Sequence, residues 1–81
     1  MRKDDREKLE NHIKTKISRS PNLSQLSFNT YKATMICQAL YESRILNYLQ
    51  LGYFLQTIKY AFEDAQKKLI IAERILNNET I

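Results

Sequence analysis

Few side chains in this sequence of 81 residues are of the kinds that carry out catalysis, and they lie far apart. The single histidine, His12, lies in a charged segment, and the single cysteine, Cys37, lies in an apolar run. A nucleophilic pair needs both side chains and an orienting group to meet, and a structural zinc site needs four ligands. Glu63 and Asp64 are adjacent acids, whose side chains diverge on a helix. We therefore expect a buried thiol at Cys37, no catalytic residue, no metal site, no cofactor and no enzymatic activity.

The composition favours helices, because one Gly and one Pro are too few turn residues for a fold with many strands. The sequence predicts an all-α fold, a small bundle of three to four helices with an amphipathic charged N-terminal helix. Residues 1–81 are expected to form a single helical domain. A chain of this size buries only about 60% of its unfolded surface, so we also expect a homodimer.

The formal net charge of +4 is concentrated near the N-terminus. Basic residues of the segment 1–19 alternate with acids at i,i+4 spacing, as in Asp4/Lys8, Arg6/Glu10 and Glu10/Lys14. Such alternation is typical of a solvated helix face. The charge pattern therefore does not favour direct nucleic-acid binding.

The first helix is predicted over residues 4–19, with a basic character and one narrow apolar stripe. Pro21 disfavours helical angles at Ser20, so the helix should end there. The stripe suits a helix that lies across the bundle, pairs with a second copy or stays loosely attached. Residues 20–28 are predicted to be a linker that is held to the core by apolar residues. The stripe consists of Leu9, Ile13 and Ile17, and the apolar linker residues are Leu23, Leu26 and Phe28.

Residues 29–77 are predicted to form the helical core, as helices over 29–43, 46–62 and 65–77. Ser27 or Asn29 would cap the first of these, and residues 42–47 would connect it to the second. Glu63 and Asp64 would end the second or cap the third. The apolar face of the first consists of Tyr31, Met35, Ile36, Ala39 and Leu40. The predicted core residues of the other two helices are Leu51, Leu55, Ile58, Phe62, Leu69 and Ala72.

The helix over 46–62 carries a second apolar face, and so does the helix that follows it. An aromatic surface of this kind suits a protein interface, where Tyr buries much area at low entropic cost. The alternative interpretation places Tyr53 and Tyr60 in the core. Gly52 would mark a helix start or a close crossing of two backbones. The predicted partner-binding residues are Leu49, Tyr53, Tyr60, Ile71 and Ile75.

The segment YFLQTIKYAFEDAQKKLIIAER, Tyr53 to Arg74, resembles the ANR family, the small AraC negative regulators of enteric pathogens. The resemblance covers about residues 39–76. Three features carry the resemblance. The first is an alanine and an acid near the end of one helix, and the second is an aromatic pair followed by a later tyrosine-alanine. The third is a set of basic residues around a large hydrophobe. The matching residues are Ala39, Glu42, Tyr53, Phe54, Tyr60, Ala61, Lys67, Lys68, Leu69 and Arg74.

The resemblance implies a negative regulator of transcription that binds an AraC-type virulence activator and blocks its dimerisation or DNA binding. It also implies possible contact with the nucleoid protein H-NS. Two alternatives stay open: a small helical chaperone or adaptor of a secretion system, and a small DNA-binding protein. The charged N-terminus has no apolar signal segment, and no apolar run is long enough for a membrane span. The expected location is the cytoplasm.

Overall fold

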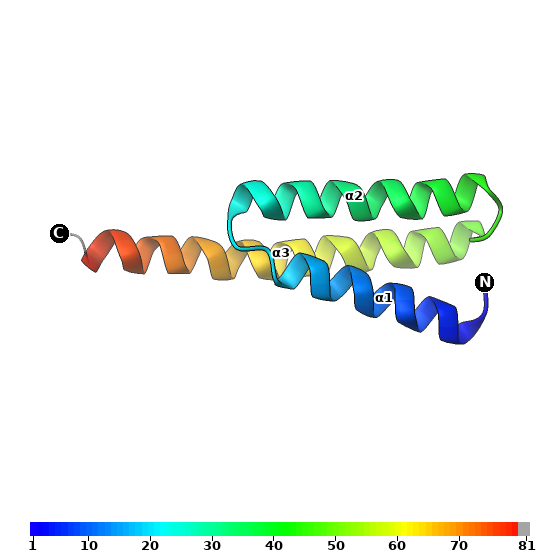
Figure 1. Ribbon diagram of the computed structural model, residues 1–81, viewed down its shortest axis with the longest axis horizontal. Coiled ribbons are helices and arrows are strands. Elements are labelled where there is room, and N and C mark those ends of the chain that lie inside the picture. Colours follow the sequence, from blue (N-terminus) through cyan, green and yellow to red (C-terminus); the bar gives the residue numbers. More distant parts are fainter. Residues whose placement is uncertain (80–81) are drawn as a thin grey trace.

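The protein is a bundle of three helices, which the computed structural model describes over residues 1–79, with side chains over residues 1–77. Helix α1 spans Lys3–Ser18, α2 spans Leu23–Glu42 and α3 spans Tyr48–Glu79. In Figure 1, α1 and α2 lie along the first part of α3, and the C-terminal part of α3 extends beyond both. A helix of 32 residues is about 48 Å long, which explains why the molecule measures 53 Å along its longest axis. The predicted all-α fold is confirmed, with no strand among the described residues.

Helix α3 is continuous, so the predicted break between helices over 46–62 and 65–77 was wrong. No Gly or Pro interrupts the sequence at this point, and the apolar stripe keeps its phase because Phe62 and Ala65 are three residues apart. Asp64 and Lys68 form an i,i+4 ion pair, with 3.1 Å between Oδ2 and Nζ. Glu63 and Asp64, which were expected to end one helix or to cap the next, therefore lie on the exposed side of a single helix.

Helix α2 begins at Leu23, so residues 23–28 belong to a helix and not to the predicted linker. Asn22 is the N-cap, and its Oδ1 accepts a hydrogen bond from the backbone N–H of Gln25 at 2.7 Å. The predicted caps, Ser27 and Asn29, lie inside α2. Asn29 instead joins the two helices, because its Nδ2 donates to Ser20 Oγ at 2.9 Å and to the Lys16 carbonyl at 3.4 Å.

The connection between α2 and α3 was correctly placed, and it contains two capping motifs. The N–H groups of Arg44 and Ile45 donate to the carbonyls of Tyr41 and Leu40, which closes the end of α2 as a Schellman motif. Arg44 has a φ of 64°, in the left-handed region that this motif usually gives to glycine. Asn47 and Gln50 then form a reciprocal capping box at the start of α3, with distances of 2.8 and 3.0 Å.

All three helices contribute to one apolar core. Ile13 and Ile17 are buried, so α1 packs within its own chain and is not loosely attached. The core of α3 is centred on Phe54, which is 1% exposed. The buried apolar residues are Ile13, Ile17, Leu26, Ala33, Cys37, Leu46, Leu51, Phe54, Ile58 and Ala65.

The predicted core of α3 was right for four residues and wrong for two. Leu51 and Ile58 are buried, and Phe62 and Leu69 pack partly against the core. Leu55 is 37% exposed because Phe54, and not Leu55, lies at the centre of the face of α3 that meets α1 and α2. Ala72 is exposed because it lies on the part of α3 that extends beyond the other helices (Figure 1).

Gly52 lies inside α3, exposed and with no heavy atom within 4 Å of the position of a Cβ. It therefore marks neither a helix start nor a close crossing of two backbones, and that prediction was wrong. Its φ is not positive, so its backbone conformation does not require glycine.

Candidate protein-binding surface

All five predicted partner-binding residues are exposed, and their spacing places them on the side of α3 that is opposite to the core. Their exposed fractions lie between 53% and 80%. The alternative in which Tyr53 and Tyr60 belong to the core is therefore wrong for this chain by itself. We call this set the α3 outer face: Leu49, Tyr53, Tyr60, Ile71 and Ile75.

The N-terminal part of the α3 outer face borders α1. The Tyr53 hydroxyl donates a hydrogen bond of 2.9 Å to Glu10 Oε1, and the same oxygen lies 2.9 Å from Lys14 Nζ. The Tyr60 hydroxyl accepts from Gln56 Nε2 at 3.0 Å. Both tyrosines line one open groove of about 570 Å³ between α1 and α3. These hydrogen bonds therefore favour one orientation of each ring along the groove.

The contact between Tyr53, Glu10 and Lys14 changes the proton affinity of each group. The hydrogen bond to Lys14 and then the one to Tyr53 lower the pKa of the Glu10 carboxyl. The bond to Glu10 raises the pKa of the Lys14 ammonium and that of the Tyr53 hydroxyl. All three shifts favour the pattern of charges that holds this contact together near neutral pH.

The C-terminal part of the α3 outer face lies on a section of helix that has no other helix beside it (Figure 1). We call residues 71–77 the α3 extension, and all seven are exposed. Ile71, Ile75 and Leu76 are each more than half exposed there. The α3 outer face thus has two parts, because Ile71 and Ile75 do not line the groove that holds Tyr53 and Tyr60.

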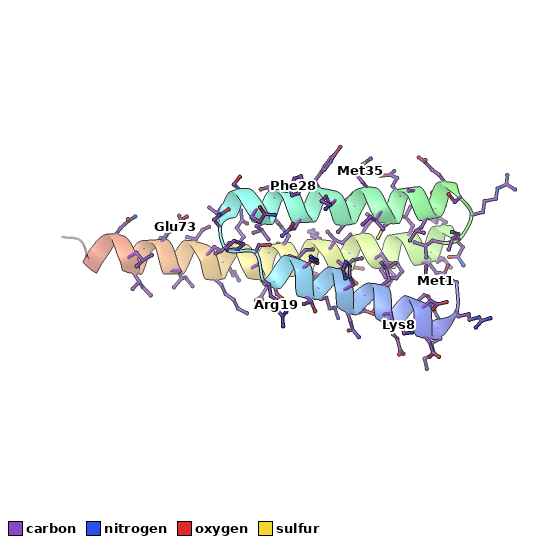
Figure 2. All side chains as sticks on the ribbon, in the orientation of Figure 1. Met1, Lys8, Arg19, Phe28, Met35 and Glu73 are labelled. Carbon is purple, nitrogen blue, oxygen red and sulfur yellow. The ribbon has the colours of Figure 1, made fainter. Side chains whose placement is uncertain are left out.

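A second exposed apolar surface lies on α2, which the sequence interpretation missed. Four residues of α2 were predicted to face the core but are exposed: Tyr31, Met35, Ile36 and Ala39. Phe28, which was predicted to anchor a linker, is exposed as well. Phe28 and Met35 point away from the bundle in Figure 2. The face that α2 buries is formed by Leu26, Ala33 and Cys37. The spacing of these three residues could have indicated it, although two of them are small.

The residues that could do chemistry lie in different surroundings. Cys37 is buried as predicted, and desolvation raises the pKa of its thiol. His12 is exposed on α1. The two side chains therefore share no open cleft. Among the described residues, no group of three or more His, Cys, Asp or Glu side chains could hold a metal ion.

No protein-family model, no curated protein and no solved structure matches this chain. In the part of the chain that the structure describes, no helix combines the length and the apolar character needed to cross a membrane.

Proposed function

We propose that this protein is a negative regulator of transcription that acts by binding another protein, an AraC-type activator, and blocks the dimerisation or DNA binding of that activator. The observation that carries the binding role is the α3 outer face, on which five large apolar or aromatic side chains are more than half exposed. The class of partner rests on the resemblance of residues 39–76 to the ANR family.

The α3 outer face has the chemistry of a protein interface. Aromatic side chains dominate the energetics of such interfaces, and exposed apolar patches mark interaction sites. The hydrogen bonds of Tyr53 and Tyr60 favour one orientation of each ring before a partner binds. An ordered ring loses little conformational entropy on binding, so this arrangement favours affinity.

The α3 extension supports the same proposal by a separate argument. A short helix without neighbours is marginally stable in water, and its stability in proteins comes mostly from packing of an apolar face. Here Ile71 and Ile75, four residues apart, form such a face, while Glu73 lies on the other side of the helix. A helix of the activator that packs against this face would be held away from its own dimer or DNA contacts.

The proposal is tested by co-purification with AraC-type activators from the same genome and by an activator-dependent reporter gene. We expect the full chain to co-purify with an activator and to lower reporter expression. The variant Tyr53→Ala/Tyr60→Ala should lose both effects and keep its melting temperature, because both side chains are exposed. The matched control is Tyr41→Ala/Tyr48→Ala, which removes two exposed tyrosines that lie outside the α3 outer face.

An unchanged reporter and unchanged co-purification in Tyr53→Ala/Tyr60→Ala would contradict the proposal. If that variant unfolds, Ile71→Asp/Ile75→Asp tests the same face on a part of α3 that lies outside the core. Recovery of H-NS, or of a secretion component, in place of an activator would identify a different partner and contradict the AraC-type assignment.

A second copy of the chain is the other partner that we propose for the α3 outer face. The extension projects beyond its own bundle (Figure 1), so two chains could pair there without moving α1 or α2. Sedimentation at micromolar concentration should give the mass of a dimer, and Ile71→Asp/Ile75→Asp should give that of a monomer. A monomer mass for the unchanged chain would overturn the homodimer.

A further inference from the structure

The entire net charge of this protein comes from one stretch of the chain. No Asp or Glu occurs between Glu10 and Glu42, whereas four basic residues do, and the rest of the chain holds nine basic and nine acidic residues. This stretch covers the second half of α1, the turn and nearly all of α2. The end of the bundle where α1 joins α2 is therefore positively charged. The four basic residues are Lys14, Lys16, Arg19 and Lys32.

Three of these four cations have no carboxylate partner among the residues that the structure describes. Lys14 pairs with Glu10, but Lys16, Arg19 and Lys32 form no ion pair with any residue that the structure describes. Lys16 and Lys32 face each other across a groove between α1 and α2, whose apolar lining includes Ile13 and Ile36. Lys16 and Arg19 line the adjoining groove near the turn. Neither groove has an acidic residue in its lining.

The cations border the apolar surface of α2. Lys32 Nζ lies 5.4 Å from the centre of the Phe28 ring, so this lysine belongs both to the groove and to the outer side of α2. Phe28, Tyr31 and Met35 are between 49% and 63% exposed there. We call the combined surface the basic face: Lys16, Arg19, Phe28, Tyr31, Lys32 and Met35.

We propose that the basic face binds an amphipathic helix of a partner protein, one that carries carboxylates along the edge of its apolar stripe. Phe28, Tyr31 and Met35 would cover the stripe, and Lys16, Arg19 and Lys32 would meet the carboxylates. This inference does not rest on the proposed function, because the basic face uses α1 and α2 and the α3 outer face lies on another helix.

Charge complementarity separates this occupant from the other candidates. The α3 extension and the helical turn before it carry Lys67, Lys68 and Arg74 against Glu73, and Lys68 pairs with Asp64. This part of a second copy therefore has no surplus of carboxylates to offer to the basic face. A nucleic acid would satisfy the cations, but it would leave Met35 and Ile36 without apolar partners. An acidic amphipathic helix satisfies both parts of the surface.

The test is an NMR titration of the full ¹⁵N-labelled chain with three probes. The first is a designed peptide of about 18 residues, long enough to form a helix, with Leu along one side and Glu along both edges of the Leu stripe. The second has Lys in place of every Glu. The third is a short DNA duplex. We expect the Glu peptide to shift the backbone signals of Lys16, Lys32 and Met35 and to bind more tightly than the Lys peptide and the DNA.

Variants identify the surface. Lys16→Glu/Lys32→Glu should bind the Glu peptide roughly tenfold more weakly, because two attractions become repulsions. The matched control Lys59→Glu/Lys67→Glu reverses two exposed charges on α3 and should bind as the unchanged chain does. Tyr31→Ala/Met35→Ala keeps every charge and should also weaken binding. The melting temperature of each variant shows whether it folds.

The proposal is overturned if the two peptides bind equally, if only the DNA shifts these signals, or if no probe does. Loss of activator binding in the Tyr53→Ala/Tyr60→Ala variant with full binding of the Glu peptide would show that the two surfaces act separately. The reverse result, an active α3 outer face and no Glu-peptide binding, would remove this inference and leave the proposed function standing.

Discussion

The packed part of α3 and the α3 extension share one apolar repeat but differ in burial. Ala72 follows Ala65 by seven residues, and Leu76 follows Leu69 by seven. Ala65 is buried and Leu69 is partly buried, whereas Ala72 and Leu76 are exposed. The difference arises because α1 and α2 lie beside the first part of α3 only (Figure 1). A seven-residue repeat thus predicts which face a helix offers for packing, but not how far its partners extend.

The largest expected effect separates these two parts of α3. Phe54→Ala should lower the free energy of unfolding by about 3–5 kcal/mol, because it empties a fully buried aromatic site. Leu76→Ala should change it by less than about 0.5 kcal/mol, because the side chain is exposed on the extension. Urea unfolding of both variants measures the difference. Equal losses would show that the extension is packed in solution, and would contradict the comparison.

A smaller effect is expected at the join between α1 and α2, within the packed region. Asn29→Ala should cost about 1–2 kcal/mol, because it removes the bonds to Ser20 Oγ and to the Lys16 carbonyl and leaves buried Ser20 less well satisfied. Thermal unfolding of this variant and of Asn11→Ala, an exposed control on α1, measures the cost. Similar stabilities for the two variants would show that the polar contact does not hold the helices together.

Helix propensity offers a finer test of the same comparison. Gly52→Ala should raise the free energy of unfolding by about 0.5–1 kcal/mol, since the site is helical, exposed and has room for a Cβ. The reverse change on the extension, Ala72→Gly, should have a much smaller effect, because that part of α3 adds little to global stability. The denaturant midpoints of the two variants measure both effects. Changes in stability of equal size would mean that α3 unfolds as one unit, and would contradict the comparison.

The smallest expected effect is on pH dependence. The lowered pKa of Glu10 in the folded chain means that this group stabilises the fold above its unfolded pKa, about 4.3. That contribution is lost as the pH falls through the folded pKa, and it amounts to a few tenths of a kcal/mol for an exposed pair. Stability of the unchanged chain should therefore fall more between pH 6 and 3 than that of Glu10→Gln. Identical pH profiles would show that the contact with Lys14 and Tyr53 does not form in solution.

The sequence predicted the fold class, the burial of Cys37 and the exposure of the α3 outer face. Residue types and a 3.6-residue period are sufficient for these, because each depends on one helix by itself. The join between α1 and α2 could not be read in this way, and on α2 the large apolar side chains of Tyr31 and Met35 favoured the wrong face. Asn29 has the right side chain for a helix cap but is used as a bridge to Ser20, and small Ala33 and Cys37 face the core in place of Tyr31 and Met35. These choices depend on how the helices pack against each other.

The most direct test of the central claim is hydrogen–deuterium exchange along α3, first in the chain alone and then with the co-purified activator. The claim is that the α3 outer face, including the extension, binds a partner protein. For the chain alone, the amides near Phe54 and Ile58 should exchange slowly, and those of residues 71–77 should exchange fast. Activator binding should slow exchange around Tyr53 and Tyr60 and in residues 71–77. Unchanged exchange along the whole of α3 in a stable complex would contradict the claim.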